Sequence, residues 1–239
     1  MITYSRRSLR LYLANRQDVL AVPLYTLAAL VLLSVLVSIV IGIATGFPLS
    51  VSVQDGFRAS SGTIWALPGF LATVGIMAAT RNFAMALAFG STRRHFWLGT
   101  MAGFVLTAAV TGVGAVVALG LERLTGHWFV GAYALDVAAL GNGNVAQTLG
   151  VVFVVALVAM TAGAMFGTVY RAFGAKTTAL LGVACVVLLF VAIAVIVGKW
   201  GSLGPLVDGW GAWAGVAVGA VFIVVTAAGS YAACQRASV

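Results

Sequence analysis

The chain has 239 residues, of which 62% are hydrophobic and only 8% are charged, and its formal net charge is +8. An ordinary soluble domain carries roughly 25% charged residues. A water-soluble fold of this length cannot bury so much apolar surface, which excludes a soluble enzyme and a soluble regulator and indicates a membrane protein.

Six stretches of the chain, each of at least 22 residues, contain no charged residue and no histidine. A helix needs about 20 apolar residues to cross the hydrocarbon core of a bilayer. The stretches are continuously apolar rather than alternating, which favours helices over the strands of a lipid-facing barrel. We therefore predict an all-α integral membrane protein with a single transmembrane domain over residues 19–234. Its six transmembrane helices are expected near residues 20–45, 62–80, 97–121, 145–169, 178–198 and 211–233.

A basic arm, residues 1–18, precedes the first of these stretches. Leu9, Tyr12 and Leu13 fall on one face of a helix, which predicts an amphipathic N-terminal helix at the membrane interface. The alternative is a plain charged anchor. The first apolar stretch is much longer than the core of a signal peptide, so we expect it to stay in the protein as an anchor.

The distribution of basic residues predicts the orientation of the chain. With six spans both termini lie on one side of the membrane, and that side holds ten of the 13 lysines and arginines. The positive-inside rule then places both termini, including a short tail at 235–239, in the cytoplasm. The basic residues flank the spans and form no groove, so no nucleic-acid partner is expected.

The sequence also predicts the form of two connecting segments on the outer side and a bend in the second span. A short polar loop is expected at 46–61, and Pro68 with Gly69 is expected to bend the second span. The longest outer segment, 122–144, is expected to hold an interfacial helix followed by a turn.

Glycines are spaced four residues apart in two of the predicted spans. Gly163 and Gly167 form such a pair in the fourth span, and Gly211, Gly215 and Gly219 form a row in the sixth. Small residues on one helix face let two helix backbones approach closely. These glycines either pack helices within one subunit or form a helix–helix seam between two subunits, and the sequence leaves both open.

The segment 81–96 connects the second and third predicted spans on the cytoplasmic side. Residues 82–89 are good helix formers, Gly90 suits the end of a helix, and Ser91 or Thr92 suits the start of the next one. The segment therefore predicts a short cytoplasmic helix followed by a sharp turn. Its apolar side chains are expected to be exposed and to contact either a partner protein or lipid headgroups. These side chains are Phe83, Met85, Leu87 and Phe89.

The six spans, the basic arm and the run Leu87-Ala88-Phe89-Gly90-Ser91-Thr92-Arg93-Arg94-His95-Phe96 resemble the permease subunit of a bacterial ATP-binding-cassette (ABC) transporter of the type-2 exporter class. The resemblance implies that the short helix is a coupling helix that touches an ATPase. The residues implied in this contact are Phe83, Met85, Leu87, Phe89 and Gly90, with Arg93 and Arg94 at the membrane rim. A smaller second contact is implied at Tyr170, Arg171 and Lys176.

The same resemblance implies the partners and the location of the chain. The partners are a cytoplasmic ABC ATPase dimer and a second permease copy or a related permease subunit, all at the bacterial cytoplasmic (inner) membrane. ATP and Mg are then bound by the ATPase, and this chain itself carries no cofactor.

The chain lacks the motifs of a catalyst or of an ATP-binding protein. It has no G-x-x-x-x-G-K-[ST] loop, and residues 174–177 only echo the end of one. No charged residue lies inside a predicted span, which argues against a proton-driven pump. The two histidines are predicted on opposite sides of the membrane, and no H-E-x-x-H motif or cysteine cluster occurs. We therefore predict no metal site and no catalytic residue.

The predicted function is a permease subunit of an ATP-driven exporter. It would move an amphipathic or lipid-like small molecule or peptide by alternating access. The alternative is a non-transporting membrane scaffold or sensor that docks a soluble partner through residues 82–90. A passive channel is disfavoured because no polar stripe lines any one span.

Overall fold

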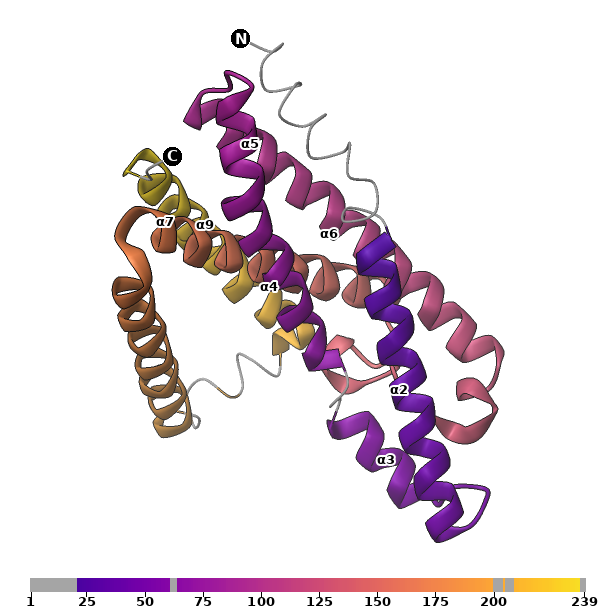
Figure 1. Ribbon diagram of the computed structural model, residues 1–239. Helices are drawn as coiled ribbons and strands as arrows, with labels where there is room; N and C mark the ends of the chain where they lie inside the picture. The colour runs from indigo at the N-terminus through magenta and orange to yellow at the C-terminus, as the bar shows by residue number, and fades with distance from the viewer. Residues whose placement is uncertain (1–20, 61–63, 200–203, 205–208, 237–239) are drawn as a thin grey trace.

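The computed structural model describes residues 21–60, 64–199, 204 and 209–236 (Figure 1). The predicted arm at 1–18 and the last residues of the predicted tail, 237–239, lie outside the described residues. Regular structure in the described part of the chain is entirely helical, as the composition predicted. Its elements are α2 (Val22–Thr45), α3 (Val51–Ser60), η2 (Ile64–Ala66), α4 (Leu67–Met77), η3 (Ala78–Asn82), α5 (Phe83–Ala88), α6 (Arg93–Leu124), η4 (His127–Gly131), η5 (Ala138–Leu140), α7 (Val145–Gly198) and α9 (Ala212–Arg236).

Five helical segments of the described chain are long and apolar enough to cross a membrane. They are Val22–Thr45, Leu67–Ala88, Arg93–Leu124, Val145–Gly198 and Ala212–Arg236. These segments confirm the predicted character of long apolar helices, which is compatible with a membrane protein. The fourth segment, α7, has 54 residues. At 1.5 Å per residue it would be about 80 Å long if straight, against about 30 Å for the hydrocarbon core.

A break in α7 lies at Gly174, where the backbone torsions are φ 82° and ψ 179°. Glycine adopts a positive φ without the steric cost that a Cβ atom brings. The α7 ribbon turns sharply in Figure 1. The predicted fourth and fifth spans, 145–169 and 178–198, fall on the two sides of the break within one element, so the count of six spans stays a prediction.

Two expectations for the first outer connection and the second span are wrong. The segment 46–61 contains the helix α3 rather than only a loop, and the Ser50 carbonyl accepts hydrogen bonds from the amides of Val53 and Gln54 at its start. Pro68 does not bend the second span, because α4 begins at Leu67 and the proline lies in the first helical turn. An amide is not needed there, so proline starts a helix at that position.

The segment 122–144 does not form the predicted interfacial helix. Residues 126–129 all have φ between 59° and 62°, so the chain makes a left-handed turn at the start of η4. A left-handed helical conformation costs roughly 1–2 kcal/mol per non-glycine residue. Side-chain contacts offset this cost, since the His127 ring packs on the Tyr133 ring with centroids 4.1 Å apart. Asn144 then caps α7, its side chain accepting two backbone amides.

The first half of α7 lies at the centre of the helix packing and contacts α4, α6 and α9. Glycines bring the backbones of α4 and α7 together. A Cβ atom on Gly75 would lie 2.1 Å from the Met160 carbonyl oxygen, and one on Gly163 would lie 2.1 Å from the Ala72 carbonyl oxygen. No side chain fits at either position, so Gly163 serves helix packing within one chain.

The glycine row predicted as a seam behaves differently at each position. A Cβ atom on Gly219 would lie 2.3 Å from a valine side chain of α7, whereas one on Gly215 would meet nothing within 4 Å. Gly211 lies before α9 with φ 54°. The α7–α9 contact also contains a buried hydrogen bond of 2.8 Å, in which the Thr226 hydroxyl donates to that of Thr161. Within the chain, only Gly219 of the row lies at a helix contact.

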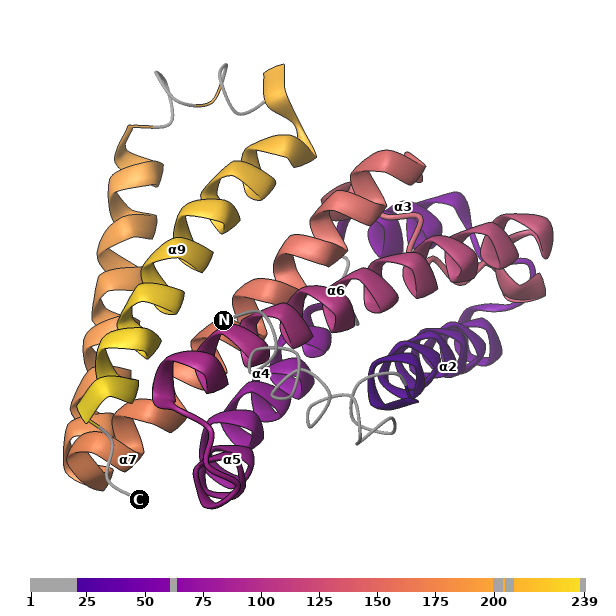
Figure 2. The ribbon, with the colours of Figure 1, turned by 90° about the horizontal axis from the view of Figure 1, so that it is seen from above.

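The second half of α7 presents an apolar surface. None of the most apolar stretch of α7 is buried inside the chain, and Leu188 and Phe190 are 67% and 68% exposed. Figure 2 shows α7 and α9 at one side of the molecule and α2 and α3 at the other. An apolar surface of this extent suits contact with lipid or with another membrane-embedded chain.

Candidate functional site at the α5 end

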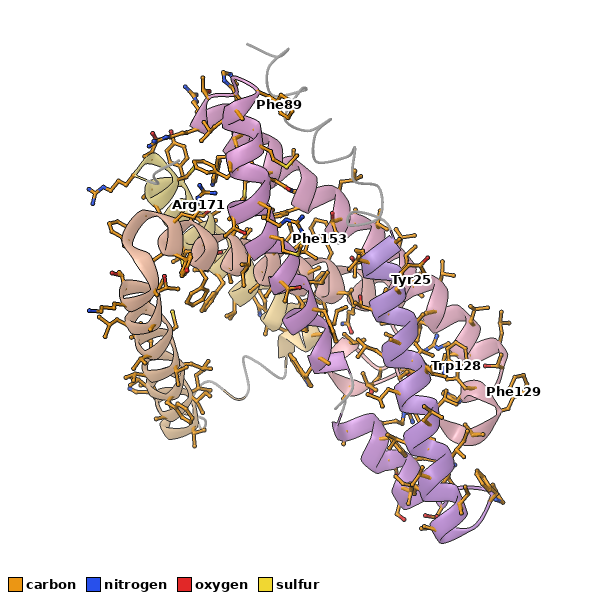
Figure 3. The ribbon with its side chains drawn as sticks, in the orientation of Figure 1. Tyr25, Phe89, Trp128, Phe129, Phe153 and Arg171 are labelled. Carbon is orange, nitrogen blue, oxygen red and sulfur yellow. The ribbon has the colours of Figure 1, made fainter. Side chains whose placement is uncertain are left out.

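Both segments that the sequence pattern singled out lie at one end of the molecule, which we call the α5 end. It comprises α5, the first turn of α6, the last turn of α9 and residues 170–176 of α7 (Figure 3). Two arginines hold these elements together. The Arg93 guanidinium donates to the Gln235 carbonyl oxygen in α9, and the Arg171 guanidinium donates to the Thr80 carbonyl oxygen in η3.

The predicted short helix is the continuation of the second segment that is long and apolar enough to cross a membrane, rather than a separate element. The π-helical turn η3 joins α4 to α5 without a break, because no glycine or proline interrupts residues 76–88. The helix ends at Ala88, and the chain reverses at Gly90, the glycine predicted to terminate it. The φ of this glycine is 76°, and its amide donates to the Leu87 carbonyl oxygen over 2.9 Å. The Thr92 hydroxyl then caps α6 by accepting the His95 amide.

Phe83 is buried, contrary to the expectation of an exposed side chain. It is 1% exposed and packs in a cluster with Ala86, Phe96 and Cys234. Its ring meets the Phe96 ring edge to face, with centroids 5.2 Å apart. Leu87 packs against the same cluster and is partly buried. Phe83 is therefore an anchor of α5 and is not accessible to a partner in this conformation.

The opposite face of α5 and the turn after it are exposed. Met85 is 55% and Phe89 72% exposed, and Gly90 and Arg94 are also exposed. Phe89 lies at the tip of the α5 end in Figure 3. Exposed Phe and Met on an ordered turn suit a contact with an apolar surface. The accessible part of the predicted primary contact therefore consists of these residues.

The predicted secondary contact also divides into an anchored and an accessible part. Arg171 Nη1 lies 2.5 Å from the Thr80 carbonyl oxygen, and the guanidinium carbon lies 4.9 Å from the centre of the Phe83 ring. Tyr170 is 54% exposed and Lys176 is exposed. Arg171 thus connects α7 to the buried side of α5, whereas its neighbours in the predicted contact face outward.

The α5 end is positively charged. Its described cations are Arg93, Arg94, Arg171, Lys176 and Arg236, and Arg81 lies just before it in η3. The acidic residues among the described ones are Asp55, Glu122 and Asp136, which lie in or beside α3 and the last turn of α6. Figure 1 shows α3 and this end of α6 at the opposite end of the molecule from α5. A positively charged end attracts anionic surfaces, either of lipids or of a protein.

A second polar cluster, which the sequence did not reveal, lies where α6 ends. Glu122 is fully buried, and its carboxylate accepts the backbone amides of Ala134, Leu135 and Asp136 at 3.2, 2.8 and 3.3 Å. It ties the loop before η5 back to α6. Residue 122 and residues 134–136 are not at the spacing of any sequence motif, so this contact can be recognised only in the structure.

Asp136 is the centre of the same cluster. Its carboxylate lies 3.6 Å from Arg123, 4.0 Å from Arg58 and 3.4 Å from the ring of His127. His127 thus takes part in an intramolecular polar cluster with Asp136. Within the described residues there is no group of three or more His, Cys, Asp or Glu residues placed to hold a metal ion. The cluster therefore joins α3, α6 and the loop before η5.

Comparisons with known proteins add no relative, because no family model, no curated protein and no solved structure matches the chain.

Proposed function

We propose that the chain is the permease subunit of an ATP-driven exporter of the ABC type. In this proposal the chain crosses a bacterial cytoplasmic membrane six times, α7 crosses twice with its reversal at Gly174, and both termini are cytoplasmic. A separate ATPase dimer, which binds ATP and Mg, docks on the α5 end. A second permease copy or a related subunit completes the pathway.

The observation that carries the proposal is an exposed apolar pair on a firmly anchored helix end. Met85 and Phe89 face outward, while Phe83 on the same helix is buried among side chains of α6 and α9. A loop that only reverses the direction of the chain does not need this arrangement. The surrounding cations and the absence of described acids at this end favour a partner whose docking surface is acidic around an apolar centre.

The helix packing supports transmission of a movement from this surface into the membrane. α5 is continuous with α4 through η3. α4 in turn packs on α7 with Gly75 and Gly163 against backbone, so no flexible side chain lies between the two helices at these points. A displacement of α5 therefore moves α4 and the first half of α7 together, because these two helices pack as a rigid pair. Closure of the ATPase dimer would supply the displacement.

The apolar character of the spans suits an amphipathic or lipid-like cargo, such as a small molecule or a peptide. The chain's residues perform no chemistry in this proposal. Their task is to bind the ATPase, to transmit its movement and to form the walls of the pathway. Alternating access then follows from rocking of the packed helices, with the energy supplied by ATP hydrolysis on the partner.

A pull-down of the native complex from the source membranes tests the proposal. The wild-type chain is expected to recover an ATPase, whereas the double variant Met85→Asp/Phe89→Asp is expected to lose it. Both side chains are exposed, so the variant should insert and fold. Phe129→Asp is the matched control, because Phe129 is 86% exposed at the other end of α6.

Recovery of the same ATPase with the double variant would overturn the placement of the docking surface. Recovery of a soluble protein of another class, such as a kinase, or of no partner would favour the scaffold or sensor and overturn the transport proposal. A loss of the ATPase with Phe129→Asp as well would show that an exposed acid anywhere disturbs the complex, and would remove the support for a specific site.

A further inference from the structure

The turn η3, residues 78–82, is π-helical and lies directly before α5. A π turn accommodates one more residue than an α-helix does over the same length, and such turns are rare and frequently lie at functional sites. A π turn inside a helix persists where other contacts compensate for the disturbed backbone hydrogen bonds. The structure supplies one such contact from another helix.

That contact is the guanidinium of Arg171. Its Nη1 donates to the carbonyl oxygen of Thr80, in the middle of η3, over 2.5 Å. The same guanidinium lies 4.9 Å from the centre of the Phe83 ring, which begins α5. α7 comes close enough because Gly167 faces η3, where a Cβ atom would lie 2.9 Å from the Ala79 Cβ atom. One side chain of α7 thus holds both the π turn and the first residue after it.

We propose that Arg171 keeps the second helix in the π register, and that this register determines which side chains of α5 face outward. One residue of an α-helix corresponds to a rotation of about 100°. If η3 became α-helical, each residue of α5 would rotate by about this angle and advance to the position that the next residue now holds. Met85 would take the position that Ala86 now holds, and Leu87 would take that of Ala88.

The two registers present different surfaces. In the π register Met85 is 55% exposed and Ala86 only 3% exposed. In the α register Met85 would face the cluster of α6 and α9, Phe83 would leave it, and Leu87 would face outward. The turn η3 is therefore an element with two discrete arrangements, which is what transmission between two sites requires.

The consequence for docking rests on the proposed function, whereas the register itself rests on the geometry alone. A partner that binds Met85 and Phe89 stabilises the π register by its preference for that surface. Arg171 lies one turn before the break at Gly174, so the register of η3 and the position of the break are connected through a single helical turn of α7. Arg171 is a positioning residue in this scheme.

Cysteine labelling of the chain alone, in lipid nanodiscs, tests the register without any partner. Single cysteines are placed at Met85→Cys, Ala86→Cys and Leu87→Cys in a background of Cys185→Ser and Cys234→Ala. Each is reacted with a polar maleimide. With Arg171 present, position 85 is expected to react at least about tenfold faster than position 86, because one is exposed and the other buried.

The variant Arg171→Met lacks the donor for Thr80 and should release the π turn. Labelling at position 85 is then expected to slow and labelling at position 87 to accelerate, while a control cysteine at Phe129→Cys reacts as before. Arg171→Lys retains a donor and should keep the wild-type pattern. The fall at position 85 is the readout that a general loosening of α5 would not produce, because loosening accelerates every position.

Three results would overturn the proposal. They are unchanged rates in Arg171→Met, faster labelling at all three positions, and an Arg171→Lys pattern like that of Arg171→Met. If Arg171→Met does not fold, the wild-type comparison still applies, since equal rates at positions 85 and 86 contradict the π register. Failure of this labelling leaves the pull-down of the ATPase untouched, and failure of the pull-down leaves the labelling untouched.

Discussion

Replacing Phe83 by alanine should destabilise the protein far more than replacing Phe89, although the two residues lie only six positions apart. Phe83 is 1% exposed and packs on Phe96 at a centroid distance of 5.2 Å, whereas Phe89 is 72% exposed. Removing a buried phenyl ring costs about 3–5 kcal/mol, which includes the loss of the aromatic pair. Removing the exposed ring should change the free energy of unfolding by at most about 0.5 kcal/mol.

Equilibrium unfolding in mixed micelles measures this difference. The purified chain is titrated with a denaturing detergent and its helicity is followed by circular dichroism, for the wild type, Phe83→Ala and Phe89→Ala. The two variants are expected to differ by about 3 kcal/mol or more. A difference below about 1 kcal/mol would refute the assignment of Phe83 as the anchor of α5 and, with it, the outward orientation of Met85.

Four further substitutions test the helix packing and the loop after α6. Gly163→Ala places a Cβ atom 2.1 Å from a backbone oxygen of α4 and should lower the free energy of unfolding by about 1–3 kcal/mol. Gly215→Ala places its Cβ atom in open space and should leave this free energy unchanged or raise it by up to about 1 kcal/mol. The same titration compares the two variants. Thr226→Val removes a buried interhelical hydrogen bond and should cost about 0.6 kcal/mol in that titration, up to about 1.7 kcal/mol; no loss would contradict a role for this bond. Glu122→Gln replaces a carboxyl group that accepts three backbone amides by a side-chain amide with a single acceptor oxygen. Limited proteolysis between α6 and α7 should therefore accelerate by about tenfold or more, and an unchanged rate would contradict the anchoring role of Glu122.

Local sequence patterns predicted those helices and helix ends that are determined by residues close together in the chain. The uncharged stretch at 20–45 became α2 at Val22–Thr45, because an apolar helix satisfies its own backbone without outside partners. Gly90 ends a helix and Thr92 starts the next one, because a left-handed glycine and a capping hydroxyl each act within one turn. These parts of the fold need no information from distant residues.

Features set by distant contacts were not predictable in the same way. The burial of Phe83 depends on Phe96 and on Cys234, which is far along the chain. Arg171 of α7 donates to the π turn η3, and a backbone amide of the loop after α6 donates to Glu122. Each of these contacts joins segments whose approach follows from the packing of whole helices, which composition and periodicity do not specify.

The division of the α5 end into anchored and exposed side chains also refines the site that the sequence predicted. Phe83 and Arg171 were predicted as partner contacts, and both hold α5 on the rest of the chain. Met85, Phe89 and Arg94 keep the accessible role. Substituting Phe83 therefore disturbs the packing of α5, substituting Arg171 tests the register of α5, and substituting the second group tests docking directly.

ATP hydrolysis by the affinity-purified native assembly, reconstituted in nanodiscs, tests the central claim most directly. We expect the wild-type assembly to hydrolyse ATP, the isolated chain to be inactive, and the assembly prepared with Met85→Asp/Phe89→Asp to lose the activity while the Phe129→Asp preparation keeps it. A wild-type assembly without ATP hydrolysis, or full activity in the Met85→Asp/Phe89→Asp preparation, would contradict a permease that is driven through the α5 end.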